Sequence, residues 1–187
     1  MVMRFLKTLL LLSLGLMGSL SAAVKTGERA PPSTCLDSAG VERRSSDFAG
    51  KYVVLEWTRH DCPFVVKFYK PGAMQALQRE LTAAGAVWLQ VVSSAPGKVG
   101  YLEAASIETL RRSTATQATA TLMDSDGRMG RAYGARTTPQ MFLIHPDGTV
   151  IYQGAIDSIP STRSSDIAPA VNYLKAAFDS ALAGAPI

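Results

Sequence analysis

Apolar runs rich in β-branched residues alternate along this chain with segments that carry a helical pattern. The runs "YVVLEW" (residues 52–57), "AVWLQVV" (86–92) and "ATLMD" (120–124) each have the length and composition of a buried strand. Helical patterns separate these runs, one starting at Pro63 and one over residues 101–113. Strands separated by helices pair in parallel through crossover connections. The sequence therefore predicts an α/β fold with parallel strands in its first half.

The two ends of the chain add elements of another kind. Residues 35–51 suit a hairpin around the turn "DSAG", and residues 137–156 suit a second hairpin with the turn "HPDG". Residues 128–134 suit one or two helical turns, and residues 166–183 a final helix. The apolar face of that helix is formed by Val171, Leu174, Phe178 and Leu182. The expected result is a mixed central sheet with helices on both faces and an N-terminal hairpin.

The helix that starts at Pro63 is predicted to be interrupted. Proline suits the first helical position, where no backbone N–H is needed. Pro71 is expected to kink or divide the helix. Beyond it, Met74, Leu77 and Leu81 form an amphipathic stripe that ends at Gly85.

The first 23 residues have the pattern of a cleaved secretory signal. "MVMRFLK" is basic, "TLLLLSLGLMGSL" is a short apolar core, and "SAA" suits cleavage after Ala23. Residues 24–187 would then form one domain, exported to the periplasm or secreted, with no membrane association after cleavage. Without Arg4 and Lys7, the 19 basic residues become 17, against 15 acidic ones. They are scattered, so we expect no nucleic-acid partner.

Only two cysteines, Cys35 and Cys62, are present. In an oxidising compartment they either form one bridge or leave at least one thiol with a chemical role. Cys62 lies in "EWTRHDCPFV", directly before the predicted helix, where the helix dipole favours the thiolate. Arg59 and His60 would add positive potential, and Asp61 would oppose it. Cys62 is therefore the candidate nucleophile.

Two motifs resemble the thioredoxin-like superfamily. One is the "ERAPP…DSAG…DFAGKYVVLEW" region with its strand, loop, cysteine, Pro63 and helix, and the other is "YGARTTPQMFLIHPDG". The redoxin branch is most similar, which includes exported thiol–disulfide oxidoreductases and relatives of the alkyl hydroperoxide reductase and thiol-specific antioxidant (peroxiredoxin-like) proteins. The resemblance covers about residues 27–180 and implies a three-layer thioredoxin-like fold.

The resemblance also implies roles for several residues. Pro139 would be a cis proline facing Cys62, and the backbone of Thr138 would hold an extended substrate chain. Glu56, six residues before Cys62, corresponds to a buried acid with a raised pKa that moves protons to and from the cysteine. The alternative for Glu56 is a strand residue that faces solvent. Phe64 would line a substrate groove or bury against the sheet.

The sequence departs from both enzyme patterns of the superfamily. Val65 stands where a second, resolving cysteine would follow Cys62, and Arg59 stands where peroxiredoxins carry a threonine. Release of a covalent intermediate would need Cys35, a small thiol reductant or a partner protein, and Cys35 could equally be an isolated buried thiol.

Some exported relatives bind copper through two cysteines and a histidine. Here Cys62 would be the only cysteine ligand, with His60 and His145 as the only histidines. This does not match the copper ligands of those relatives, so we expect no metal and no cofactor.

These observations predict an exported thiol-dependent oxidoreductase that acts through Cys62, with Glu56 and Arg59 tuning its protonation. Its substrate would be a protein disulfide or thiol, or a peroxide. The alternative is a non-catalytic thioredoxin-fold module that binds a protein or peptide, because fold alone does not establish turnover.

Overall fold

The structure, a computed structural model, describes residues 23–187. The predicted signal sequence lies, except for Ala23, outside the described residues. The elements are β1 (Thr34–Leu36), β2 (Glu42–Arg44), η1 (Ser45–Phe48), β3 (Val53–Trp57), α1 (Pro63–Tyr69), α2 (Ala73–Ala83), β4 (Val87–Val92), α3 (Ala104–Ser113), β5 (Ala120–Met123), α4 (Arg128–Tyr133), β6 (Gln140–Ile144), β7 (Val150–Gly154), η2 (Ser164–Asp166) and α5 (Tyr173–Leu182).

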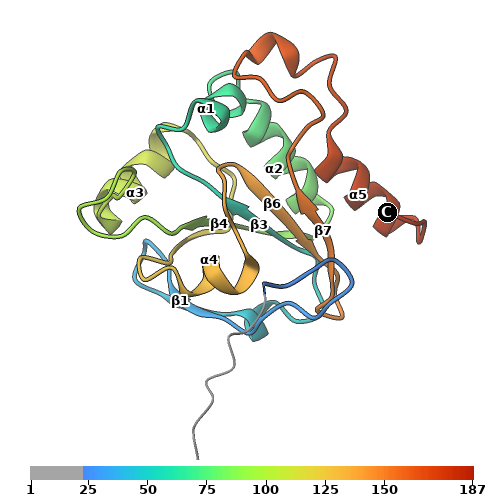
Figure 1. Cartoon of the computed structure of the whole chain (residues 1–187), viewed down its shortest axis with the longest axis horizontal. Coiled ribbons are helices and arrows are strands. Elements are labelled where there is room, and N and C mark those ends of the chain that lie inside the picture. Colours follow the sequence, from blue (N-terminus) through green and yellow to red (C-terminus); the bar gives the residue numbers. More distant parts are fainter. Residues whose placement is uncertain (1–22) are drawn as a thin grey trace, which may run out of the picture.

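The central sheet has five strands in the order β5-β4-β3-β6-β7. Strands β3, β4 and β5 are parallel, whereas β6 pairs antiparallel with β3 and β7 pairs antiparallel with β6. The small β1–β2 hairpin lies beside this sheet (Figure 1). The predicted mixed thioredoxin-like sheet is confirmed, because the crossover helices and the late hairpin fix the strand directions as the pattern required.

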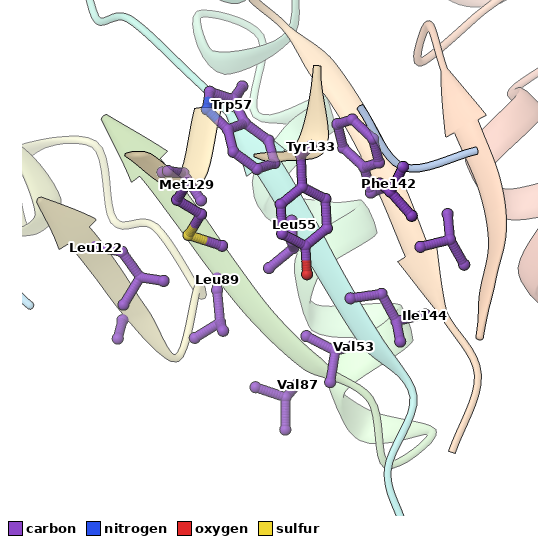
Figure 2. Packing of buried hydrophobic residues seen from close by; sticks show 14 residues of the cluster. Val53, Leu55, Trp57, Val87, Leu89, Leu122, Met129, Tyr133, Phe142 and Ile144 are labelled. Carbon is purple, nitrogen blue, oxygen red and sulfur yellow. The ribbon is translucent and has the colours of Figure 1, made fainter. Parts of the chain in front are cut away.

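Alternation along the strands divides the core into two layers. Val53, Leu55 and Trp57 of β3 pack with α4 on one face, where Trp57, Tyr133 and Phe142 form an aromatic cluster (Figure 2). Val54 points to the other face, which α1, α2 and α5 cover. Each layer is built from apolar side chains that are removed from water, which is the main source of stability in such a core. The predicted helices on both faces are therefore confirmed.

The helix after Cys62 is divided as predicted. α1 ends at Tyr69, and α2 begins at Ala73 after Pro71 and Gly72. Gly72 has φ of +82°, a left-handed conformation that glycine adopts at little cost. Met74, Leu77 and Leu81 are buried, so the predicted stripe faces the core.

The C-terminal helix is shorter than predicted. Residues 166–183 were expected to be helical, but α5 begins only at Tyr173, where the side chain of Asn172 caps the helix by accepting a hydrogen bond from Lys175 N at 2.9 Å. Pro169 lies before the helix, where its ring and missing N–H oppose helical continuation. Two residues of the predicted apolar face are exposed: Val171, which precedes α5, and Leu182, the last residue of α5.

Among residues 23–187, no helix combines the length and apolar character needed to cross a bilayer.

Candidate active site around Cys62

Cys62 is the residue that caps the N-terminus of α1. Strand β3 leads directly into the loop that carries it, and Pro63 occupies the start of the helix, as predicted. Its carbonyl oxygen accepts hydrogen bonds from Val65 N and Val66 N, both at 2.9 Å. The sulfur therefore lies at the positive end of the helix dipole, where an anion is stabilised.

The loop before β6 contacts the sulfur from the other side. Cys62 Sγ donates a hydrogen bond to the carbonyl oxygen of Thr138 at 3.0 Å. The Thr138–Pro139 peptide bond is cis, which confirms the prediction. Cys62 exposes only 7 % of its surface, so little of the residue is accessible to a reactant. The sequence correctly placed Cys62, Thr138 and Pro139 together; their roles stay predictions.

The charges next to Cys62 largely balance one another. Arg59 Nε lies 2.6 Å from Asp61 Oδ1, although the contact lacks hydrogen-bond geometry. His60 is exposed. The stem of Arg59 packs so closely on Gly100 that a Cβ atom added there would lie 2.3 Å from Arg59 Cδ. Arg59 is thus positioned by a neighbouring loop, and its charge is offset by Asp61.

Glu56 is fully buried, so of the two interpretations of the sequence, the buried acid is correct and the solvent-facing strand residue is wrong. Its carboxylate accepts hydrogen bonds from Tyr69 Oη at 2.8 and 2.9 Å, from Trp88 Nε1 at 2.9 Å and from Gln78 Nε2 at 3.3 Å. Burial raises the pKa of Glu56 to about 7, and the hydrogen bonds from Trp88, Tyr69 and Gln78 partly oppose this effect. Glu56 therefore exchanges a proton near neutral pH.

The partners of Glu56 form a polar network that does not include Cys62. Tyr69 Oη also accepts hydrogen bonds from Gln78 Nε2 at 2.9 Å and from Gln90 Nε2 at 2.6 Å. Tyr69 is the last residue of α1, so the network ties the end of this helix to β3, β4 and α2. These contacts link Glu56 to the end of the helix that carries Cys62, and its role in moving protons to and from Cys62 stays a prediction.

Phe64 and Val65 follow Cys62 in the first turn of α1 but face opposite ways. Phe64 is 44 % exposed, so it does not bury against the sheet, and it remains available to a substrate. Val65 is 3 % exposed. The position of the absent second cysteine is therefore filled by a packed core side chain.

Cys35 lies away from this site. It belongs to β1 and packs against the α4 layer of the core, whereas α1 lies on the other side of the sheet (Figure 1). Both thiols are free. Burial, together with the charges of Asp124 and Asp126, raises the pKa of the Cys35 thiol to about 11. The structure thus argues against Cys35 as the resolving thiol and favours the interpretation as an isolated thiol.

Within residues 23–187, no group of three or more His, Cys, Asp or Glu side chains is placed to hold a metal ion. His145 lies in the turn after β6, where its Nδ1 is 3.1 Å from Asp147 Oδ1. It stacks edge-on against Tyr52, with ring centroids 5.5 Å apart.

Sequence reasoning missed a buried ion pair that anchors α1. Lys67 is almost completely buried; its Nζ lies 2.7 Å from Asp157 Oδ2 and donates to the carbonyl oxygen of Ile159 at 2.9 Å. Gln78 was also missed, although its place on the apolar stripe of α2 was a usable indication. Lys67 gave no comparable indication, because its partner is 90 residues away.

Comparison with protein families gives one match, to the description "AhpC/TSA family", over residues 26–153. The match spans more than half of the chain and includes Cys62, Thr138 and Pro139. The chain belongs to the AhpC/TSA family. No curated protein matches it.

Solved structures of low sequence identity share the fold of this AhpC/TSA member. An uncharacterized conserved protein from Geobacillus kaustophilus is 20 % identical with a TM-score of 0.73, covering 87 % of this chain and 85 % of that one. A putative thiol:disulfide interchange protein DsbE from Chlorobium tepidum is 21 % identical with a TM-score of 0.59, covering 86 % and 99 %. An exposed lipoprotein thioredoxin from Streptococcus pneumoniae is 20 % identical with a TM-score of 0.56, covering 80 % and 99 %. These similarities establish the thioredoxin-like fold.

Proposed function

We propose that this protein is an exported thiol-dependent oxidoreductase in which Cys62 is the single nucleophile. The observation that carries the proposal is the position of Cys62 Sγ, which lies at the N-terminus of α1 and 3.0 Å from the carbonyl oxygen of Thr138. The helix dipole stabilises a thiolate, and the Thr138–Pro139 loop offers backbone groups to a bound chain. Family membership supports the same reaction class.

With a disulfide substrate, the Cys62 thiolate attacks one sulfur and forms a mixed disulfide, while the other sulfur leaves as a thiolate. Because Val65 replaces the second cysteine, a thiol from another molecule must attack the mixed disulfide and release Cys62. With a peroxide, the thiolate takes one oxygen and becomes a sulfenic acid, and the alcohol or water leaves with a proton. Two equivalents of an external thiol then return Cys62 to its thiol and form one disulfide and one water.

A second candidate is a binding module without turnover. Two observations favour it: Val65 is packed in the core, and Cys62 exposes only 7 % of its surface. In this alternative, the exposed Phe64 and the Thr138–Pro139 loop would hold a peptide by contacts alone.

The reactivity of the two thiols separates these candidates. Brief treatment with iodoacetamide at pH 7, followed by mass spectrometry, should modify Cys62 well before Cys35. Cys35→Ser is the matched control and should keep the reactive thiol, whereas Cys62→Ser should lose it. If Cys62 reacts no faster than a free model thiol, the oxidoreductase proposal is wrong and the binding module stands.

Turnover assays then identify the substrate class. Hydrogen peroxide and an oxidised peptide should be offered with an external thiol such as dithiothreitol, and Cys62→Ser should abolish the consumption that depends on the protein. Export is tested separately by fractionating cells that produce the full chain, in which we expect a product that starts at Val24.

A further inference from the structure

A cavity lies on the opposite side of the sheet from α1. Its volume is about 400 Å³, which is within the range of small-molecule sites. The floor is the apolar face of the sheet, one wall is α4, and residues of the N-terminal segment, β2 and η1 line the other side. The apolar floor is formed by Val53, Leu55, Leu89, Leu122 and Ile144.

One polar group inside this cavity is unpaired. Tyr133 is 2 % exposed, and its hydroxyl makes no hydrogen bond to any residue that the structure describes. Figure 2 shows the hydroxyl pointing away from Trp57 into the space between Leu55, Val53 and Ile144. Burial alone raises the pKa of Tyr133 far above its ordinary value, so the group is a neutral donor. The hydroxyl is not among the fully buried side-chain atoms that lack a partner, so it keeps contact with the space of the cavity, where a ligand oxygen could accept a hydrogen bond from it.

The mouth of the cavity carries an excess of positive charge. Arg29, Arg43, Arg44 and Lys51 line the cavity, with Asp147 as the acidic residue among them. Arg43 and Arg44 are neutralised by Asp37 and Glu42, at 2.8 and 2.6 Å. Arg29 donates to the carbonyl oxygen of Asp147, and Lys51 is exposed without an ion pair to any described residue. Arg29 and Lys51 therefore face one carboxylate, that of Asp147, which leaves the mouth with an excess of one positive charge.

We propose that this cavity binds a medium-chain fatty carboxylate that carries an oxygen within its chain. The chain fills the apolar space, the carboxylate lies beside Lys51 and Arg29, and the Tyr133 hydroxyl donates to the chain oxygen. The apolar floor, the Tyr133 hydroxyl as a donor and the net positive charge of the mouth match this amphiphile and disfavour a cationic one. The site is separate from Cys62 and does not depend on the proposed redox function.

Calorimetric titration tests the ligand class with three probes of one chain length. These are dodecanoate, a mid-chain hydroxydodecanoate and dodecyltrimethylammonium, all below their micelle concentrations. The hydroxylated carboxylate should bind about tenfold more tightly than dodecanoate, the difference expected for one buried hydrogen bond. The cation should not bind measurably. Equal binding of the cation, or no binding of either carboxylate at millimolar concentration, overturns the proposal.

Variants place the ligand in the cavity. Tyr133→Phe should remove the preference for the hydroxylated probe while leaving dodecanoate affinity equal or improved. Lys51→Glu should weaken both carboxylates about threefold to tenfold, because a charge-assisted contact is lost. Lys70→Glu is the control, since it makes the same charge change at an exposed lysine outside the cavity.

The folded state of each variant is checked by circular dichroism, and a folded Tyr133→Phe that keeps the preference overturns the assignment of the hydroxyl. A third variant, Leu122→Phe, fills the floor and should reduce binding of both carboxylates. Unchanged affinity in a folded Leu122→Phe protein, or equal effects of Lys51→Glu and Lys70→Glu, would show that the amphiphile binds elsewhere.

Discussion

Replacing Glu56 with glutamine should change how the stability of this protein depends on pH. The amide has the shape of the neutral carboxyl, so it can still accept from Trp88 and Gln78 and contact Tyr69, but it does not ionise. Glu56 is fully buried, and burial is the largest cause of its raised pKa. The variant therefore removes one titration and keeps most of the packing.

The sign follows from proton binding. The pKa of Glu56 rises from its ordinary 4.5 to about 7 in the folded protein, so between these values the folded state holds a proton that the unfolded chain has released. The stability that this group contributes is complete below its unfolded pKa and is lost as the pH rises through 7. At about 1.4 kcal/mol per pH unit, the free energy of unfolding should fall by about 3 kcal/mol across this window.

The other acidic groups whose pKa values are shifted titrate outside this window. The pKa values of Asp37, Asp126, Asp147 and Asp166 are lowered, and the pKa of the Cys35 thiol is raised to about 11. Urea unfolding followed by far-ultraviolet circular dichroism at pH 5, 6, 7 and 8 isolates the effect of Glu56. The Glu56→Gln protein should have the flatter profile, and above pH 7 it should be the more stable by up to about 3 kcal/mol.

Glu103→Gln provides the matched control, because it makes the same chemical change at an exposed carboxylate. Its pH profile should follow that of the wild-type protein. A wild-type profile that is flat between pH 5 and 8, or a Glu56→Gln protein with the same slope, would refute the reasoning.

Three further predictions follow from the contacts of single residues. Asp157→Ala should lower the free energy of unfolding by about 3–5 kcal/mol in urea titrations, because it leaves Lys67 charged and buried without its partner. Gly100→Ala should lower Tm, because a left-handed backbone costs about 1–2 kcal/mol and the new Cβ also displaces the Arg59 side chain. Cys35, with a pKa of about 11, should react with iodoacetamide at pH 8 about a hundredfold more slowly than a thiol of pKa 9.0, as measured by mass spectrometry.

These three predictions can be checked against control variants or contradicting outcomes. Asp179→Ala removes an exposed partner of Lys175 and should cost less than 1 kcal/mol, about the contribution of a surface pair. Gly97→Ala introduces the same strain, with φ of +75°, into open space, so any larger loss at Gly100 measures the Arg59 contact. Rapid modification of Cys35 in the folded protein would contradict the burial that raises its pKa. Equal costs at Asp157 and Asp179 would contradict the buried ion pair.

The sequence predicted the parts of the fold that depend on local periodicity. "YVVLEW" reads as a buried strand from its composition alone, and the positions of Pro63 and Pro71 divide the following helix for steric reasons that act within a few residues. The predicted start of the C-terminal helix was wrong, because features within a few residues decide where this helix begins. Residues 166–172 share its apolar spacing, but Pro169 and the Asn172 cap decide where the helix starts, and these local features outweigh the pattern.

The surroundings of Cys62 could be predicted only in part, because their contacts join residues that are distant in sequence. Family motifs placed Cys62 beside Thr138, 76 residues away. No motif linked Lys67 to Asp157, or Glu56 to Tyr69, because a polar residue on a predicted helix is normally assigned to solvent. Burial of these groups is tolerated only because each meets its partner in the folded chain. The two buried sets therefore act together. One holds Lys67 near the middle of α1 and the other holds Tyr69 at its end, so these contacts fix the helix that carries Cys62, in addition to the hydrogen bond of the Cys62 side chain to Thr138.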